Sequence, residues 1–568
     1  MINCRSPRGS KECVIVSQGA TGQVRLSGAI YCWRNSVGRL SEPGLTIKAR
    51  SLYLIRLNQC DAGDYKMTVE PGSVATTKDV VTYQHFINGA YVDPVDGEWM
   101  DTVDPYRNEV WARIPRGSIN DIDRAVAAAR AAMTEGPWAR ITPTERGKLM
   151  RRLGDLVAEN AERLAAIEVR DNGKLMSEML GQLRYHPDWW YYFAGLADKI
   201  EGSVVPIDKP DHFAFTDHEP IGVVGALTAW NSPLLFIAFK CAPALAAGCA
   251  VVIKPSEFTS ASTLEFAALT REAGIPDGVF NVVAGLGAEA GAALVDHKDV
   301  AKISFTGSDR TGAMIYSQAA KTMKRVSLEL GGKSPNIIFD DANLDAAAAG
   351  AVSGIFAATG QTCIAGSRLL VQNSIKEEVT ERLVAMARTA KIGDPMSPDT
   401  NIGPVTTAPQ YQKILDYIDI AKSEGARLVT GGGPSDAGPQ FVQPTIFTDV
   451  DNAMRIAQEE VFGPVLSIIG FDDEDEAVRI GNDVIYGLAA GVWTQNIGRA
   501  HRMAKALKAG TVWVNTYRAI SYMMPFGGAK HSGLGRENGM DAIKEFLEVK
   551  SVWINTSDDA PGNPFVMR

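Results

Sequence analysis

The sequence predicts an α/β protein in which two domains are each built around a mostly parallel sheet. From Pro220 onward, short apolar runs alternate with alanine-rich helical stretches, and the runs are residues 223–227, 250–253, 279–283 and 302–305. Alternation at this spacing is typical of a doubly wound sheet, which binds ligands at the carboxyl ends of its strands. A second alternating region runs from Asn336 to about Val514. We therefore expect a second α/β domain that shares a cleft with the first.

The length, composition and net charge of the chain limit the kinds of partner that it is expected to bind. The chain has 568 residues, of which 45% are hydrophobic and 22% charged, as is typical of a large soluble globular protein of two or more domains. The net charge of −9 and the lack of a Lys/Arg-rich run disfavour nucleic acid or an anionic membrane as a partner. Residues 221–239 are uncharged and long enough to resemble a membrane span, but Asn231-Ser232-Pro233 interrupts them. We expect a small-molecule substrate, no nucleic acid, no membrane and no metal site.

The first 66 residues differ in composition from the rest. They contain four of the seven cysteines, and only Cys241, Cys249 and Cys363 lie in the remainder. The main body is therefore not a disulfide scaffold, and a cytoplasmic location fits it. The first 66 residues also hold ten Lys/Arg and four Asp/Glu, a net charge of +6. We expect a poorly ordered or appended segment, with Met67 as a candidate start of the functional chain.

Local signals define the elements that come next. Residues 84–89 and the short runs after them predict an edge hairpin, and residues 119–133 predict a helix. Thr142 is the predicted N-cap of the following helix, because Pro143 suits the first helical position and Glu145 completes a capping box.

The most informative residue is Cys363, which ends the sequence GQTC at residues 360–363. Glu329 precedes it in ELGGKS at residues 329–334. A glycine-flanked loop lets a substrate carbonyl approach the sulfur, and a glutamate with a raised pKa activates water against a thioester. The pair favours acyl-enzyme chemistry, although a lone cysteine is more often an inert core residue. A phosphate-binding P-loop is excluded, because Ser327 stands where its first glycine is required.

Two strand ends offer further ligand groups. Ser308 follows a strand through Gly307 and begins a helix, so free backbone N–H groups there form an anion site. Lys254 and Glu257 follow another strand and provide a cation and a carboxylate at the same sheet edge. A looser G-x-G-x-x-A pattern at residues 285–290 lacks the acidic residue expected about 20 positions on. Each of these loops is also compatible with an ordinary turn.

Together these motifs resemble the aldehyde dehydrogenase superfamily from about Phe86 to about Thr556. They match it in order and spacing, and they are AWNSP (229–233), KPSE (254–257), FTGS (305–308), ELGGK (329–333), GQTC (360–363), EEVFGP (459–464) and PFGG (525–528). The resemblance implies a Rossmann-like cofactor domain, a second α/β catalytic domain and a small β oligomerisation arm. It assigns no role to the opening segment.

The resemblance implies the NAD-dependent oxidation of an aldehyde to the carboxylic acid. In this mechanism the Cys363 thiolate attacks the aldehyde and forms a hemithioacetal, from which hydride leaves to the nicotinamide ring. The oxyanion lies between the Asn231 side-chain amide and the Cys363 backbone N–H. Glu329 then deprotonates the water that cleaves the thioester. Its presence favours a free acid as the product over transfer of the acyl group to coenzyme A.

The resemblance also implies the cofactor and substrate positions. Because the Glu257 carboxylate accepts from both ribose hydroxyls and repels a 2′-phosphate, NAD is expected rather than NADP. The implied cofactor residues are Trp230, Lys254, Ser256, Glu257, Gly307, Ser308, Glu460 and Phe462. The implied substrate tunnel is apolar, and its residues are Phe236, Phe239, Ile520 and Phe526. It favours aliphatic, terpenoid or aromatic aldehydes over charged ones such as betaine aldehyde, although Arg518 and Tyr522 lie nearby. The same side chains are also compatible with packing at the domain junction.

The domain boundaries follow from the composition and the resemblance. The opening segment is 1–66, the NAD-binding domain is 67–197 and 220–331, the catalytic domain is 332–545, and the arm is 198–219 and 546–557. The resemblance implies that the hairpin of the arm pairs with a strand near the C-terminus of another subunit. Since exposed strand edges need a partner, we expect a homodimer or homotetramer.

Two other functions remain open at this point. A cysteine-dependent esterase or hydrolase would also use Cys363, but no motif marks a catalytic histidine. A noncatalytic binding relative is expected to have lost Cys363, Glu329 or Asn231, and all three are present.

Overall fold

A computed structural model describes residues 80–558, residues 563 and 565, and six strands before residue 80. The contacts divide the chain into two units, Met1–Asp79 and Val80–Arg568. The first unit contains a sheet of order β1-β2-β5-β6 and a separate β3-β4 pair. The strands are β1 (Ile2–Arg5), β2 (Lys11–Ile15), β3 (Gln23–Arg25), β4 (Thr46–Lys48), β5 (Tyr53–Gln59) and β6 (Tyr65–Pro71).

The boundary of the opening segment differs from the prediction. The sequence placed it after residue 66, but Met67 lies within β6 and pairs with Leu57 of β5. A boundary at that point divides a strand, and the structure places the division after Asp79. The prediction of poor order concerns residues that mostly lie outside the described part of the chain.

The first sheet of the second unit has eight strands in the order β27-β17-β16-β13-β14-β15-β8-β9. Its strands from β17 to β15 run parallel, which confirms the predicted doubly wound sheet. The predicted edge hairpin is the antiparallel pair β8 and β9. The strands are β8 (His85–Ile87), β9 (Ala90–Val92), β13 (Val223–Leu227), β14 (Ala250–Lys254), β15 (Phe280–Val282), β16 (Val300–Thr306), β17 (Arg325–Glu329) and β27 (Gly533–Leu534).

The helices of this lobe begin where local signals place them. Thr142 Oγ1 accepts the backbone N–H of Glu145 at 3.2 Å, and the Glu145 carboxylate accepts the N–H of Thr142 at 2.9 Å, which is the predicted capping box. The helices are α1 (Ile119–Thr134), α2 (Pro143–Asn172), α3 (Met176–Tyr185), α4 (Pro187–Leu196), α5 (Pro233–Ala247), α6 (Ala261–Glu272), α7 (Ala292–Asp296) and α8 (Asp309–Ala320). The short strands β7 (Val81–Thr82), β10 (Trp99–Asp104) and β11 (Glu109–Pro115) form a separate sheet.

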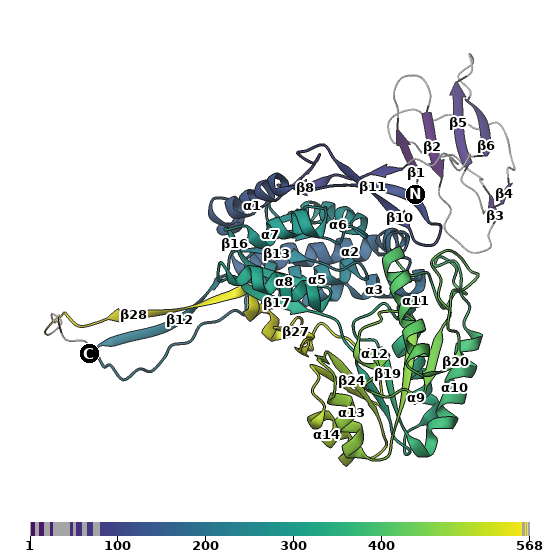
Figure 1. The fold of residues 1–568 in the computed structure, drawn as a ribbon. Coiled ribbons are helices and arrows are strands. Elements are labelled where there is room, and N and C mark those ends of the chain that lie inside the picture. Colours follow the sequence, from purple (N-terminus) through teal and green to yellow (C-terminus); the bar gives the residue numbers. More distant parts are fainter. Residues whose placement is uncertain are drawn as a thin grey trace. The chain divides into compact units, whose positions relative to one another are not determined.

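The second sheet has the order β20-β21-β22-β19-β18-β24-β25 and is parallel except for β20. Figure 1 shows the two sheets in separate lobes, with α9 to α14 in the second. The strands are β18 (Pro335–Ile338), β19 (Arg368–Gln372), β20 (Arg427–Thr430), β21 (Thr445–Thr448), β22 (Val465–Phe471), β24 (Ala489–Trp493) and β25 (Thr511–Val514). The helices are α9 (Leu344–Phe356), α10 (Lys376–Thr389), α11 (Ala408–Ser423), α12 (Arg455–Gln458), α13 (Glu474–Asn482) and α14 (Ile497–Ala506). A further pair joins β23 (Tyr486–Gly487) to β26 (Ala529–Lys530).

The chain crosses from the first sheet to the second within a few residues. Strand β17 ends at Glu329 and β18 begins at Pro335. Cys363 lies between the short helix η3 (Ala357–Gly360) and β19. Glu329 therefore lies at the carboxyl end of a strand of the first sheet, which is where α/β proteins bind ligands, and Cys363 lies in the loop before a strand of the second sheet.

An extended arm consists of two long strands. β12 (His212–Pro220) pairs antiparallel with β28 (Leu547–Asn555) along its whole length. Figure 1 shows this pair projecting from the first lobe. The expected pairing with the C-terminal strand of another subunit is wrong, because β12 pairs with β28 of its own chain. The earlier half of the predicted hairpin forms only an isolated bridge, Val204 to Phe215, since Pro206 and Pro210 lack the backbone N–H that a ladder needs.

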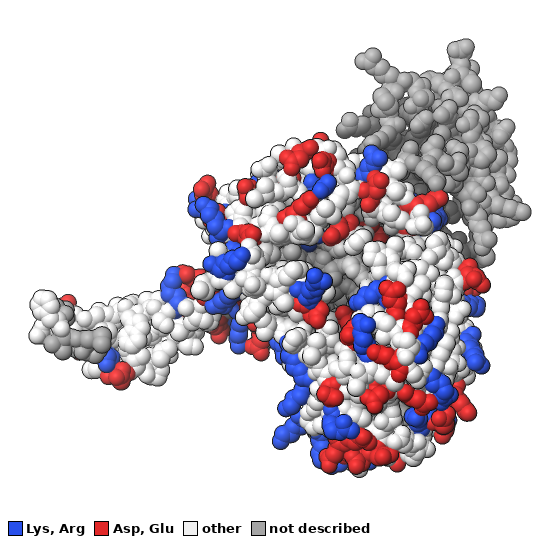
Figure 2. All heavy atoms as spheres, viewed as in Figure 1, with Lys and Arg blue, Asp and Glu red and all other residues white. Residues whose placement is uncertain are grey.

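The face of the two lobes that is visible in Figure 2 is not dominated by one sign of charge. Figure 2 shows acidic and basic side chains interspersed over the visible side of the two lobes, whereas the arm is mostly uncharged. Among the described residues, no helix has both the length and the apolar content that crossing a membrane requires.

Removal of residues 1–79 tests the division into units. We expect the chain from Val80 onward to keep its activity and its melting temperature within about 2 °C, less than about 1 kcal/mol for a large domain. As a control, removal of residues 1–92 also takes away β8 and β9, and with them Phe86, which is 2% exposed. That variant is expected to melt well below the first in differential scanning calorimetry. A marked loss in the first variant contradicts the division.

Candidate active site

A cavity of about 130 Å³ lies where β16 and β17 end, and residues of both lobes line it. It brings together Cys363, Glu329 and Asn231, which come from three separate segments. The other lining residues are Ala229, Trp230, Phe236, Thr306, Gly307, Ser308, Leu330, Gly331, Gln410, Lys413, Glu460 and Phe462. No histidine is among these described residues, so the cavity does not offer the cysteine a histidine base.

The loop that carries Cys363 is held by backbone conformation and by one buried glutamine. Gly360 has φ 70°, and a Cβ there would lie 2.1 Å from the carbonyl oxygen of Gly463, so only glycine fits. The Gln361 side chain accepts the N–H of Thr406 at 2.9 Å and donates to the carbonyl of Pro404 at 3.3 Å. These bonds fix the position of Gln361, which lies two residues before Cys363.

Asn231 is joined to the same loop. Its Nδ2 donates to the backbone carbonyl of Gln361 at 3.0 Å. A side-chain amide carries two N–H donors, so the second remains for an oxygen in the cavity. Ser232, the next residue, accepts from Lys174 Nζ at 2.6 Å, which steadies the turn before α5.

Glu329 is a buried carboxylate without a hydrogen bond. It is 5% exposed, and neither of its oxygens has a partner in the described part of the chain. Burial, followed by the Glu537 carboxylate, raises its pKa well above the ordinary value, while Lys240 and Arg536 oppose the rise. Unpaired buried carboxylates are rare and concentrate at functional sites. A base with a raised pKa is suited to activating water at neutral pH.

Sequence reasoning missed the ion pair beside Glu329. Lys240 Nζ donates to Glu537 Oε1 at 2.5 Å and to Ser304 Oγ at 3.3 Å, and both charged side chains are buried. A signal was present, because Lys240 is the one charged residue in the otherwise apolar α5. Its partner is 297 residues away, which no local pattern reveals.

The surroundings keep Cys363 protonated at rest. Burial, then the carboxylates of Glu460 and Glu329, raise the pKa of the thiol to about 12. Since the thiolate is the nucleophile, the proton must leave as the sulfur attacks. Glu329 lines the same cavity and has a raised pKa, so it is able to accept that proton.

The predicted cofactor residues fall into two groups. Trp230, Gly307, Ser308, Glu460 and Phe462 line the cavity. The Trp230 and Phe462 rings meet edge to face at 5.2 Å. Glu460 Oε1 accepts the N–H of Gly332 at 2.9 Å. These contacts form a walled recess beside the cysteine.

The second group lies at the end of β14, away from the cavity lining. Lys254 Nζ pairs with Glu257 Oε2 at 2.9 Å, and Ser256 lies between them in the chain. The glycine-containing segment at residues 285–290 also lies here, because the N–H of Gly287 donates to Glu257 Oε1 at 3.5 Å. The hydroxyls of Thr228 and Thr306 are buried and have no partner among the described residues. Thr228 follows β13, the strand beside β14, and Thr306 ends β16 and lines the cavity. Donors and acceptors thus extend from the cavity to β14, which fits a dinucleotide.

The predicted substrate tunnel is only partly reproduced. Phe236 lines the cavity, whereas Phe239, Ile520 and Phe526 do not. Phe239 and Phe526 instead belong to an aromatic wall with Trp189, Tyr185 and Tyr522, whose rings meet their neighbours at 4.9–5.9 Å. Trp189 and Tyr185 were missed, since their role depends on how α3 and α4 pack.

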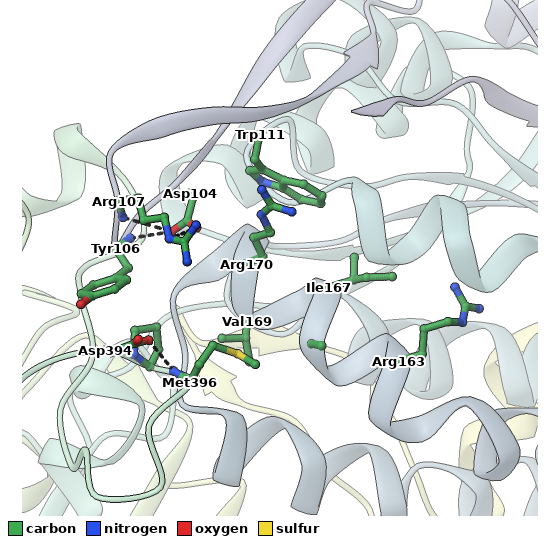
Figure 3. A pocket seen from close by; sticks show the side chains of 12 residues that line it. Asp104, Tyr106, Arg107, Trp111, Arg163, Ile167, Val169, Arg170, Asp394 and Met396 are labelled. Carbon is green, nitrogen blue, oxygen red and sulfur yellow. Dashed lines mark hydrogen bonds and ion pairs between the residues drawn. The ribbon is translucent and has the colours of Figure 1, made fainter. Parts of the chain in front are cut away.

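A larger cavity of about 460 Å³ lies elsewhere in the second unit. It is lined by residues of β10, β11, α2 and the segment around Pro395, and Figure 3 shows Arg170 beneath the Trp111 ring, 4.8 Å from its centre. It contains none of the predicted site residues, so its size does not make it the reaction site.

Comparison with known proteins agrees with this geometry. The profile of the aldehyde dehydrogenase family matches residues 91–552. The chain belongs to the aldehyde dehydrogenase family. A relative from Acinetobacter baylyi, (Z)-2-((N-methylformamido)methylene)-5-hydroxybutyrolactone dehydrogenase, is 46% identical over 86% of this chain and 99% of its own.

Two solved structures show the same fold. The NAD+ complex of an aldehyde dehydrogenase from Bacillus cereus has a TM-score of 0.83 at 45% identity, covering 84% of this chain and 97% of that one. A betaine aldehyde dehydrogenase from Staphylococcus aureus in complex with NAD+ has a TM-score of 0.84 at 41% identity, covering 86% and 97%.

This aldehyde dehydrogenase therefore catalyses the NAD-dependent oxidation of an aldehyde. The expectation of a Rossmann-like cofactor domain with a second α/β domain is confirmed.

The Lys240–Glu537 pair predicts how the pH profile of this dehydrogenase responds to mutation. Glu329 must be deprotonated to act as a base, so activity rises with pH through its pKa. Because the Glu537 carboxylate raises that pKa and Lys240 lowers it, Glu537→Gln shifts the acid limb to lower pH and Lys240→Met shifts it to higher pH. The expected size is on the order of one pH unit, equal to about 1.4 kcal/mol of charge interaction.

The measurement is the rate of acyl-enzyme hydrolysis against pH, after a single turnover. Arg388→Gln, which removes an exposed cation on α10, serves as the control and should not move the limb. Shifts of both variants in the same direction rule out this electrostatic account.

Proposed function

We propose that Cys363 is the nucleophile of this dehydrogenase, that Asn231 holds the oxyanion, and that Glu329 is the base for deacylation. One observation carries the assignment: the unpaired, buried Glu329 carboxylate lies in the same cavity as the thiol and the Asn231 amide. A hydrolase lacks any need for the recess of Trp230, Glu460 and Phe462, which supports dehydrogenation over simple ester cleavage.

The chemistry follows from these groups. The Cys363 sulfur bonds to the aldehyde carbon as its proton passes to Glu329, and the oxygen becomes an oxyanion. The second N–H of Asn231 and the Cys363 backbone N–H are positioned to stabilise that charge, which is worth a few kcal/mol per donor in comparable sites. NAD, when bound, accepts the hydride from the substrate carbon, which leaves a thioester. Glu329 first releases the cysteine proton to solvent and then takes a proton from water, whose oxygen attacks the thioester. The C–S bond breaks, the acid leaves, and the sulfur regains a proton from Glu329, which restores the thiol.

The cofactor residues complete the proposal. Glu257 with Lys254 suits the two ribose hydroxyls, and the carboxylate disfavours a 2′-phosphate, which supports NAD over NADP. Ser308 caps α8, whose N-terminal N–H groups suit the pyrophosphate. We assign residues 80–197 and 220–331 to the NAD-binding domain and 332–545 to the catalytic domain. The free thiols of Cys241, Cys249 and Cys363 support a reducing compartment such as the cytoplasm.

Two substitutions test the roles in one experiment. Cys363→Ala removes the nucleophile and is expected to abolish NADH formation while NAD still binds. Glu329→Gln keeps the nucleophile, so it should release at most one NADH per active site and then stall, because general-base catalysis is worth about 10²–10⁴-fold. The readouts are NADH absorbance in a stopped-flow instrument and the mass of the accumulated acyl-enzyme.

Cofactor binding supplies the control. Isothermal titration with NAD should give similar affinities for the native chain and both variants. Substantial turnover by Cys363→Ala, or an unchanged steady rate in Glu329→Gln, refutes the corresponding role.

We also propose that the arm is covered by a second copy of the chain, giving a homodimer or a homotetramer. A two-stranded ribbon is marginally stable alone. The arm exposes several large apolar side chains, and these are Phe213, Val549, Trp553 and Ile554. The edge of β28 that faces away from β12 suits further pairing, whereas the outer edge of β12 is partly occupied by residues 203–205.

Removal of residues 548–568 tests the assembly. It takes away nearly all of β28 and leaves β12 without a partner, so we expect insoluble or inactive protein. Trp553→Glu places a charge in the exposed apolar surface and is the milder variant, expected to dissociate the oligomer without removing a strand. Light scattering at micromolar concentration gives the mass. An active native monomer refutes the proposal.

A further inference from the structure

One arginine beside the nucleophile has no role in the chemistry described above. The segment at residues 515–522 is tied to the Cys363 loop by one bond, in which Tyr517 Oη donates to the carbonyl of Ile364 at 3.0 Å. Arg518 Nη1 donates to the carbonyl of Ser353 in α9 at 2.9 Å. Trp513 Nε1 donates to the carbonyl of Ala519 at 2.9 Å, which closes the turn after Arg518. Arg518 therefore directly follows a residue that bonds to the cysteine loop.

The backbone at Arg518 is itself unusual. Its φ is 65°, in the left-handed region that disfavours side chains with a Cβ. Such conformations persist where the surrounding structure imposes them, often at ligand sites. The conformation is maintained by the bonds of its neighbours, Tyr517 and Ala519.

The guanidinium of Arg518 keeps most of its donors. A guanidinium has five N–H donors, and among the described residues only the Ser353 carbonyl accepts from it. No carboxylate of the described part forms an ion pair with it within 4.0 Å. Arg368, which is fully buried, instead makes four bonds through all three of its nitrogens. Arg518 is half-buried, so its remaining donors are open to solvent or to a ligand.

Two cations lie on this side of the cysteine. Arg518 and Lys174 both interact electrostatically with Cys363 and with Glu178. Glu178 already accepts the N–H of Ala358 at 2.7 Å. Burial raises the pKa of the neighbouring carboxyl group of Glu168 and lowers the pKa of Lys174.

The aromatic wall described above includes Tyr522, which lies four residues after Arg518 in the same segment. Its ring contacts Tyr185, Trp189 and Tyr192 at 5.3–5.7 Å. Arginine recognises carboxylates through paired N–H bonds, which makes a carboxylate its best partner.

Resting on the function proposed above, we propose that Arg518 determines specificity, by selecting aldehydes that carry a carboxylate at the end remote from the carbonyl. Arg518 holds that carboxylate with its free N–H groups and repels cationic aldehydes. The substrate class is an oxo acid whose apolar body contacts the aromatic wall. The apolar tunnel expected from sequence thus ends at a cation.

The test compares aldehydes that differ in charge and little in shape. One pair is 4-formylbenzoate and 4-formylbenzamide, and the other is betaine aldehyde and 3,3-dimethylbutanal. We expect kcat/KM for the benzoate to exceed that for the benzamide by about 10-fold or more, as is typical of hydrogen bonds to a charged group. The dimethyl aldehyde should be preferred over betaine aldehyde. The preference should appear mainly in KM, because Arg518 does not act on the reacting atoms.

Substitution of Arg518 then tests whether this residue causes the preference for the benzoate over the benzamide. Arg518→Gln should bring the benzoate-to-benzamide ratio to about 1, and Arg518→Lys should keep only part of it, since lysine lacks the paired donors. Arg388→Gln, which removes an exposed cation elsewhere, should keep the native ratio. Because each ratio is internal to one protein sample, a partly unfolded variant does not distort it.

Two outcomes overturn the proposal. They are a native enzyme that oxidises the benzamide as well as the benzoate, and an Arg518→Gln variant that keeps the native ratio. Either result leaves the roles of Cys363 and Glu329 intact. If the native enzyme oxidises none of the four aldehydes with NAD and Glu329→Gln shows no burst, the catalytic assignment fails, and the specificity proposal fails with it.

Discussion

The site depends on one buried side chain, Gln361, which joins three parts of the fold. Its backbone carbonyl receives the Asn231 amide from the NAD-binding lobe, and its side chain bonds Thr406 and Pro404 of the other lobe. Thr406 in turn donates to the carbonyl of Asn172 at the end of α2. Because the nucleophile lies two residues after Gln361, its distance from the oxyanion donor is set by these bonds. A shift of either lobe would separate the groups that the reaction needs.

Buried charges in this protein fall into two kinds. Structural ones are satisfied, as Arg368 is by carbonyls and an asparagine, and such groups contribute rigidity. Buried charges of the second kind have a proposed function and lack hydrogen-bond partners within the described part of the protein. Glu329 has no hydrogen bond in this part of the chain, and its pKa is raised. An unsatisfied buried charge costs the fold about 1–3 kcal/mol or more, so its retention is understood through the ligand that completes it.

Chemistry and selectivity are carried by different segments. Asn231 and Glu329 end strand-linked segments of the first sheet, whose parallel core holds them rigidly, and Cys363 is held by the loop before β19. The residues that we propose for the rest of the substrate come from α3, α4 and the segment at 515–522, whose aromatic side chains pack on the main core. This separation allows the far end of the substrate to be recognised by side-chain changes that leave the reacting groups in place.

The sequence by itself determined the elements that depend on nearby residues. The capping box at Thr142 and Glu145 and the parallel strands from 223 to 305 follow from propensities within a few positions, and ordered motifs named the residues that meet in the cavity. Tertiary structure alone decided the pairing of Lys240 with Glu537, the return of β28 to β12, and the boundary at Asp79. These features depend on which distant segments pack together, and the free energy that selects them is spread over the whole core rather than encoded in a local pattern.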